Sequence, residues 1–257
     1  MSAVRESLSE RLAVISRIGV LMLRSGAASF RVEDVMRRVA TVLDVQSIDM
    51  FVTPSGMVLT LIESGPPRTV TLKIPPIGVD MVRISALEEL SRTLPETITL
   101  AELSQRLDGI EHRPPMYSRL TVILMVGLAC GAFAVILGGS AGEFVAAFTG
   151  AMLAQYLRFR LLASHVSPYL VTTVCAASAT LISEIAVHLF NAPTPRAALI
   201  ASVLLLVPGV PFITALLDLV HLDLISGIAR GTYAALLLMF IGLGMLLVLT
   251  ITGTGIL

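Results

Sequence analysis

The fold of the second half of this chain is decided by Ala201-Ser-Val-Leu-Leu-Leu-Val-Pro208-Gly209-Val210-Pro211-Phe-Ile-Thr-Ala-Leu-Leu-Asp218. The stretch is apolar enough for a membrane helix, but two prolines and a glycine interrupt its middle. Proline lacks a backbone N–H, and its ring clashes with the carbonyl four residues earlier. A helix in hydrocarbon must satisfy its backbone groups internally, so a break persists only where it faces protein or water. We therefore expect a helix broken at Pro208-Gly209-Val210-Pro211.

Composition indicates a membrane protein in which a charged part precedes an apolar part. Of the 257 residues, 55% are hydrophobic, and the mean hydropathy is +0.88. Residues 1–118 hold 13 of the 18 Lys and Arg and 14 of the 18 Asp and Glu. The chain therefore divides near Pro114 into a predicted soluble domain, 1–113, and a predicted transmembrane domain, 114–257.

Several classes of function are disfavoured. The net charge is zero and no basic cluster is present, so we expect no nucleic-acid partner. Cys130 and Cys175 lie in apolar runs, where cysteine usually acts as a small hydrophobe, and we expect no disulfide, metal site or cofactor. Charged residues interrupt the N-terminus, so we expect no signal peptide and a first domain that stays in the cytoplasm.

The first half begins with the pattern of two amphipathic helices. Apolar residues recur at helical spacing over about residues 5–24 and again up to Leu43. Gly26 is typical of a helix stop, and Ser29 is the expected cap of the second helix.

Strand patterns follow and complete an expected α+β domain. Three β-prone runs separated by turns predict an antiparallel meander at residues 47–53, 57–62 and 69–74. Helical patterns return at 83–94 and 99–110, with Thr99 as a cap, so we expect helices packed on one sheet. The domain has no cysteine and no glycine-rich phosphate loop, which favours a ligand-sensing, gating or assembly role over catalysis.

The second half contains five expected transmembrane helices. They cover residues 120–137, 144–157, 168–190, 197–217 and about 229–252. The loops expected on one side hold Arg113, Arg119, Arg158, Arg160 and Arg230, and the opposite loops hold Arg196. The positive-inside rule then places the N-terminus in the cytoplasm and the C-terminus in the periplasm of a bacterial inner membrane.

Small residues recur at spacings typical of close helix packing. The pairs are Gly127 with Gly131, Gly138 with Gly142, Ala146 with Gly150, and Gly227 with Gly231. Such pairs let helix backbones approach within the bilayer. They serve contacts inside the chain or contacts with a partner, including a second copy in a homo-oligomer, and the sequence does not divide them.

An ionisable group at membrane depth costs about 2.5–3.5 kcal/mol on insertion scales. Each such residue in an expected span is therefore expected to have a structural or functional role. Glu184 lies in the third span, one turn before His188. It is either an interfacial carboxylate that pairs with His188 or a group that carries protons or gates.

Asp218 and Asp223 flank the connection between spans four and five, and Arg230 follows. These residues either cap two helices in a charged cytoplasmic loop or form an inner vestibule. In the vestibule, Arg230 would meet an anionic substrate, because its planar fork suits carboxylates. The aspartates would then shape the path or couple protons.

The break supplies the remaining candidates for substrate contact. A break beside Pro208, Gly209 and Pro211 exposes carbonyls and the positive end of the second half-helix, expected from Phe212 onward. Ser202 and Thr214 lie on either side and offer hydroxyls. The alternative is a packing kink, but half-helices of this kind often mark a substrate site in transporters.

The chain resembles the threonine/serine exporter (ThrE) family. The residues that carry the resemblance are the broken stretch up to Asp218, Ser226-Gly-Ile-Ala-Arg230, Gly19-Val-Leu-Met-Leu-Arg-Ser-Gly-Ala27, Arg31-Val-Glu33 and Val58-Leu-Thr60. More narrowly, it is similar to the split exporters associated with succinate. Thr214 departs from the family pattern, in which asparagine is expected.

This resemblance implies a cytoplasmic N-terminal domain, five spans, and a further five-span unit on a separate YjjB-like subunit. We therefore expect a non-enzymatic subunit of a secondary exporter for a small organic acid, with a C4 dicarboxylate favoured over threonine or serine. The alternatives are a threonine/serine exporter, a membrane-anchored ligand sensor, and a scaffold that only assembles another complex.

Overall fold

A computed structural model describes residues 8–63, 65–75, 78–164 and 166–253 of the chain. The chain forms two compact units, and neither of them is continuous in sequence. The first combines Met1–Pro114 with Val210–Thr232, and the second combines Pro115–Gly209 with Tyr233–Leu257. The N-terminal domain expected from the sequence thus shares its unit with a segment from the second half.

The first unit contains the predicted α+β elements. They are α1 (Leu8–Arg24), α2 (Ser29–Val42), β1 (Ser47–Thr53), β2 (Gly56–Ile62), β3 (Arg68–Lys73), α3 (Met81–Thr93) and α4 (Leu100–Glu111). The strands form an antiparallel sheet in the order β1-β2-β3, which confirms the expected meander. The register pairs Val52 with Met57 and Leu59 with Val70.

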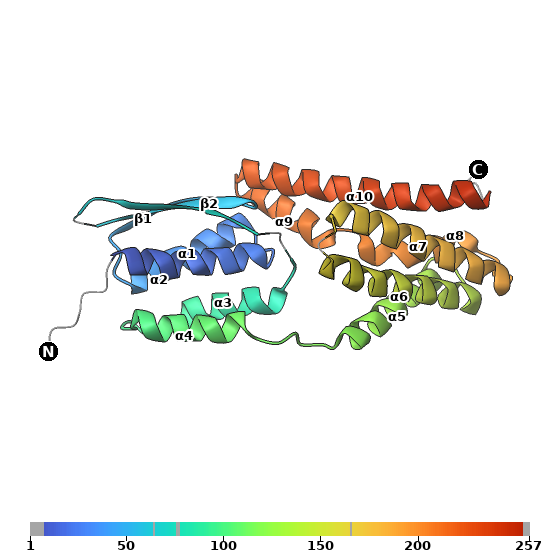
Figure 1. Ribbon diagram of the computed structural model, residues 1–257, viewed down its shortest axis with the longest axis horizontal. Helices are drawn as coiled ribbons and strands as arrows, with labels where there is room; N and C mark the ends of the chain where they lie inside the picture. The colour runs from blue at the N-terminus through green and yellow to red at the C-terminus, as the bar shows by residue number, and fades with distance from the viewer. Residues whose placement is uncertain (1–7, 64, 76–77, 165, 254–257) are drawn as a thin grey trace. The chain divides into compact units, whose positions relative to one another are not determined.

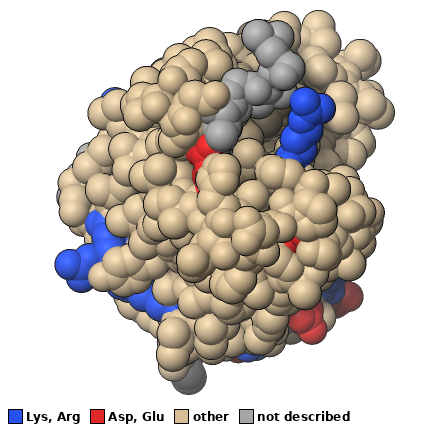
Figure 2. Space-filling view, turned by 90° about the vertical axis from the view of Figure 1, so that its right-hand side faces the viewer, with Lys and Arg blue, Asp and Glu red and all other residues tan. Residues whose placement is uncertain are grey.

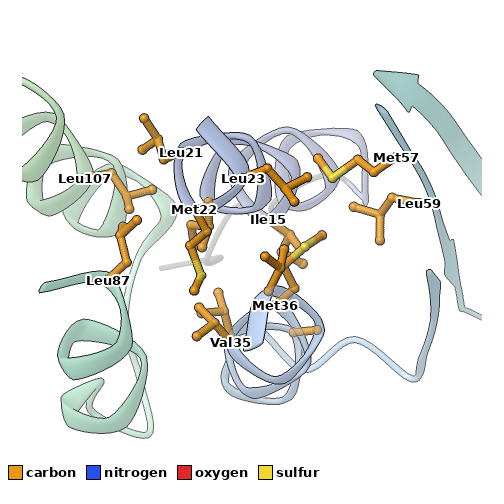
Figure 3. Packing of buried hydrophobic residues seen from close by; sticks show 14 of the residues in the cluster. Ile15, Leu21, Met22, Leu23, Val35, Met36, Met57, Leu59, Leu87 and Leu107 are labelled. Carbon is orange, nitrogen blue, oxygen red and sulfur yellow. The ribbon is translucent and has the colours of Figure 1, made fainter. Parts of the chain in front are cut away.

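The helices of this unit form two layers over one face of the sheet. β1 and β2 cover one side of α1 and α2, and α3 and α4 lie on the other side (Figure 1). Figure 3 shows Ile15 and Met22 of α1 between Leu59 of β2 and the α3–α4 side, where Leu87 and Leu107 point inward. All five side chains are buried in one apolar cluster. This cluster holds the sheet and the helix layers together.

The two predicted helix caps had opposite outcomes. Thr99 caps α4 as expected, because its side chain accepts a hydrogen bond from the backbone of Glu102. Ser29 is not the cap of α2: Ala28 occupies that position and makes no side-chain bond, and Ser29 is the first helical residue. Gly26 has a positive φ of 89°, the conformation expected of a glycine after a helix end.

The remaining helices include the membrane-capable segments. They are α5 (Arg119–Ile136), α6 (Ala141–Ala163), α7 (Pro168–Leu189), α8 (Pro195–Val203), the 3₁₀ turn η1 (Leu204–Leu206), α9 (Gly209–Val220) and α10 (Leu224–Thr252). Within the described residues, three helices are long and apolar enough to cross a membrane, or four if the broken pair of α8–η1 and α9 is one span. Few charged side chains lie on the face shown in Figure 2.

The second expected span, residues 144–157, lies within α6, which does not meet that criterion. This helix has sufficient length, but Glu143, Gln155, Arg158 and Arg160 interrupt its apolar run. The five-span count therefore stays a prediction.

The second unit packs through small residues, as the sequence indicated. A Cβ on Gly150 of α6 would lie 2.2 Å from Ser183 Oγ and 2.6 Å from the carbonyl oxygen of Ala179, both on α7. A Cβ on Gly127 of α5 would lie 2.6 Å from Met152. The backbones of α5, α6 and α7 approach so closely that these positions have room only for hydrogen.

Candidate functional site

The expected break in the fourth span is present but shorter than predicted. The chain leaves helical geometry at Val207, whose backbone is extended, and α9 begins at Gly209. Gly209 N–H donates to the carbonyl of Val207 at 2.8 Å. Pro211 lies in the first turn of α9, where a missing N–H leaves no intrahelical bond unmade. The expectation that the second half-helix starts at Phe212 is therefore wrong, because a proline in this turn is compatible with the helix.

The hydroxyls near the break already bond to their own helices. Ser202 Oγ donates to the carbonyl of Leu199 at 2.8 Å, and Thr214 Oγ1 donates to the carbonyl of Val210 at 2.9 Å. Both residues are buried. A hydroxyl hydrogen can rotate, so each side chain can accept from a ligand donor in this state or turn away from its carbonyl and donate to a ligand acceptor.

Asp218 and Arg230 form a buried ion pair within the first unit. Arg230 Nε lies 2.9 Å from Asp218 Oδ2, and the side chains are 5% and 0% exposed. The two groups attract each other as opposite charges, although the N–H of Nε is not aligned with Oδ2. The sequence singled out both residues, and the structure brings them together.

The partners of this ion pair come from the loop before α2. Ser29 N–H donates to Asp218 Oδ1 at 2.7 Å, and Arg230 donates from Nη2 to the carbonyl of Ala27 at 2.7 Å. The first amides of a helix have no intrahelical acceptor and carry its positive dipole end. Asp218 therefore accepts the hydrogen bond of the first amide of α2 from a distant part of the chain.

Two further contacts join the same segments. Ser226 Oγ donates to the carbonyl of Val52 at 3.0 Å, which ties α10 to β1. The rings of Phe30 and His221 stack with centroids 3.7 Å apart and an interplanar angle of 2°. The connection from α9 to α10 is thus held by α2 on one side and β1 on the other.

Asp223, the third predicted acid of this region, lies in the α9–α10 connection and is partly buried. Its backbone N–H donates to the carbonyl of Asp218 at 2.9 Å. Burial, followed by the negative charge of Asp223, raises the pKa of Glu33 on α2. Asp223 therefore lies close to both Asp218 and Glu33.

The other predicted residues belong to the second unit. Glu184 is buried in α7, whereas His188 one turn later is exposed. Pro208 is buried and Gly209 is exposed at the end of that unit. Within the described residues, no group of three His, Cys, Asp or Glu side chains is placed to hold a metal ion.

Sequence reasoning missed one fully buried carboxylate, Glu143. Its Oε2 accepts from the backbone and hydroxyl of Ser140 in a capping box, and its Oε1 accepts from the backbone and hydroxyl of Thr194. The signal Ser140-Ala-Gly-Glu143 is visible in the sequence as S-x-x-E. With four donors on two oxygens, Glu143 joins the start of α6 to the start of α8 and has a structural role.

Several apolar helices and a broken span are the features of a multi-pass membrane protein. The family model described as "Putative threonine/serine exporter" matches residues 13–252. The chain belongs to this threonine/serine exporter (ThrE) family.

Two curated relatives cover nearly the whole chain, and a third covers about half of it. The chain is 33% identical over 243 residues to "Probable succinate transporter subunit YjjP" of Escherichia coli, covering 91% of this chain and 92% of that protein. It is 30% identical over 234 residues to the protein of the same name from Klebsiella aerogenes, covering 90% of each. An "Uncharacterized protein" of Haemophilus influenzae is 28% identical over 127 residues, 49% of this chain and 42% of that protein. No solved structure matches.

Proposed function

We propose that this chain is a subunit of an inner-membrane secondary exporter for succinate or a similar C4 dicarboxylate, working with a separate YjjB-like subunit. The observation that carries the proposal is the similarity over nine-tenths of the chain to two proteins named as succinate transporter subunits. Threonine or serine is the second candidate substrate, because the family description names these amino acids.

The proposed substrate contacts are the break and its flanks. They are Ser202, Pro208, Gly209, Pro211, Thr214 and Arg230. Glu184, Asp218 and Asp223 are the proposed groups for proton coupling or gating. For Glu184, which lies within α7, the cost of inserting an ionisable group into a membrane helix supports this assignment, because a carboxylate without a function would be disfavoured there. Arg230 suits a carboxylate substrate, since its guanidinium can donate two parallel hydrogen bonds.

The contacts of the first unit support the proposed orientation. The end of α9 and the start of α10 bond to the α1–α2 loop and to β1. The α9–α10 connection should therefore lie on the same side of the membrane as the N-terminal domain. With that domain in the cytoplasm, the span formed by α10 takes the C-terminus to the periplasm.

Counterflow in proteoliposomes tests the substrate and the partner together. The chain is reconstituted alone and with the neighbouring five-span subunit, and exchange of labelled succinate, threonine and serine is measured. We expect succinate exchange only when both subunits are present. Exchange of threonine or serine without exchange of succinate would show that the second candidate substrate is the right one. Exchange of none of the three would refute transport of these substrates.

A pH gradient imposed on the same proteoliposomes tests the coupling ion. Proton coupling predicts that succinate efflux responds to the gradient and that Glu184→Gln or Asp223→Asn weakens this response. Efflux that ignores the gradient would exclude these acids as coupling groups.

A further inference from the structure

We propose that the N-terminus of α2 and Arg230 form a carboxylate-binding site that Asp218 occupies from within the chain, and that a carboxylate substrate binds there by displacing Asp218. The identity of that substrate as a dicarboxylate rests on the proposed function. The site itself rests on the geometry of four residues, two of which belong to the N-terminal domain.

Two donors converge on a single carboxylate. Ser29 N–H bonds to Oδ1 of Asp218 at 2.7 Å, and Arg230 Nε lies 2.9 Å from Oδ2. One donor is a helix N-terminus and the other is a guanidinium, and proteins use both to bind carboxylates. Each oxygen of the bound group thus has its own cationic or dipolar partner.

Asp218 does not bond to every polar group of this site. Within the described part of the chain, Ser29 Oγ is buried and has no hydrogen-bond partner. Arg230 Nε and Asp218 Oδ2 are paired at 2.9 Å, so the hydroxyl of Ser29 is the group of this site that Asp218 does not bind. Asp218 reaches the site on a short side chain fixed to α9. An untethered carboxylate can take up the orientation that the donors favour.

Charge explains why binding and displacement are linked. Asp223 bonds through its backbone N–H to the carbonyl of Asp218, and its negative charge also acts on Glu33 of α2. A second carboxylate entering beside Asp218 would bring like charges together in a buried region, which is costly. The incoming group must therefore replace Asp218, and this replacement breaks the hydrogen bond between α9 and the Ser29 amide of α2. Binding of the substrate carboxylate would thereby weaken the attachment of the N-terminal domain to the α9–α10 connection, while the bonds of Arg230 to Ala27 and of Ser226 to Val52 remain.

Chemical rescue tests the site without measuring transport. Asp218→Ala is purified in detergent, and its thermal unfolding is followed with added sodium formate, acetate or succinate, against sodium chloride at equal ionic strength. Formate fits the volume that the lost carboxylate vacates, so we expect the carboxylates to raise the Tm of the variant and to leave that of the unaltered protein nearly unchanged. A Tm shift equal in both proteins, or equal to that in chloride, would overturn the proposal.

Two variants control this result. Arg230→Gln combined with Asp218→Ala should abolish the rescue, because the guanidinium is then absent. Glu102→Ala removes an exposed carboxylate that pairs with Arg106 and should show no rescue. Rescue in either control would refute the assignment of the site to Arg230.

Asp218→Asn serves if the alanine variant does not fold, since it keeps an acceptor for Ser29 N–H and loses the competing charge. Removal of an internal competitor should tighten succinate binding on the order of tenfold in direct titration. Unchanged or weaker binding would refute displacement.

The outcomes separate this site from the proposed function. Rescue by formate and acetate, with no binding or export of succinate, would establish the site and refute the proposed substrate. Succinate export with an unchanged KM in Asp218→Asn, and no rescue in Asp218→Ala, would leave the proposed function standing and refute the site.

Discussion

The ion pair of Asp218 and Arg230 should be coupled far more strongly than an exposed pair of the same chain. The perturbation is a double-mutant cycle of Arg230→Gln, Asp218→Asn and the combined variant. Arg230→Gln leaves a carboxylate that is 0% exposed without its counter-charge and removes the hydrogen bond to the carbonyl of Ala27.

The magnitude follows from this burial. Removal of one partner of a buried pair typically costs about 3–5 kcal/mol, because the remaining charge is desolvated and unpaired. The combined variant leaves no unpaired buried charge. Its loss in the free energy of unfolding should therefore be smaller than the sum of the losses in the two single variants. We expect an interaction free energy of about 2–3 kcal/mol, near the upper end for contacting residues.

Arg106 and Glu102 provide the matched control. Their charged atoms lie 2.7 Å apart, close to the 2.9 Å of the buried pair, but their side chains are 40% and 49% exposed. An exposed pair at this spacing on a helix is worth about 0.3–0.5 kcal/mol. The free energy of unfolding is measured in detergent for both cycles. Equal coupling in the two cycles would refute the argument that burial determines the strength of the pair.

Three further predictions concern packing, hydrogen bonding and pH. A Cβ on Gly244 would lie 2.5 Å from the carbonyl oxygen of Thr173, so Gly244→Ala should lower the free energy of unfolding by about 1–3 kcal/mol. Gly242 on the same helix is the control, because nothing lies within 4 Å of a Cβ there. Gly242→Ala should raise the free energy of unfolding by up to about 1 kcal/mol. Equal effects of the two substitutions in unfolding assays would contradict the packing argument. Glu143→Gln places an NH₂ group where two donors now bond to a carboxylate oxygen. This substitution should lower the free energy of unfolding by about 1–3 kcal/mol. An unchanged Tm would exclude the four-donor arrangement. Burial and a neighbouring aspartate raise the pKa of Glu33 above its ordinary value of 4.5, so the folded state binds this proton more tightly and stability falls as the pH rises through and above 4.5. Glu33→Gln should flatten that fall in a pH series of unfolding curves, and an unaltered slope would contradict the cause.

Local patterns predicted the elements of the N-terminal domain because local physics determines them. The strand alternation of Met57, Leu59 and Leu61 reflects burial of one sheet face, and Thr99 caps a helix through a residue three positions away. Ser29 failed as a cap for the opposite reason. The acceptor for its amide comes from Asp218, at a sequence separation of 189 residues, and no local rule includes such a partner.

The candidate site was predictable in its residues and not in its contacts. Asp218 and Arg230 stand out in the sequence because charges are rare in that half of the chain. Their partners are the backbone groups of Ala27 and Ser29. Almost every residue type carries the same backbone groups, so the sequence does not show which of them take part. The S-x-x-E motif similarly reveals one half of the Glu143 network, whereas Thr194 is joined to it only by the fold.

The position of the break was predicted closely because proline chemistry is local, but its length was overestimated. Pro208 interrupts the helix, whereas Pro211 is accommodated in the first turn of α9. One proline ends a helix and the next is compatible with starting one, and the sequence alone does not show which role each takes.

The discontinuous make-up of the first unit has a consequence for biogenesis. Met1–Pro114 leave the ribosome early, but Val210–Thr232, which belong to the same unit, follow roughly 100 residues later. At 5–20 residues per second, the nascent domain waits on the order of 5–20 s for Asp218 to reach the amide of Ser29. During this interval the intervening helices must enter the membrane. Completion of the domain can therefore serve as a check that α9 and α10 have inserted with the correct ends on the side where the domain waits.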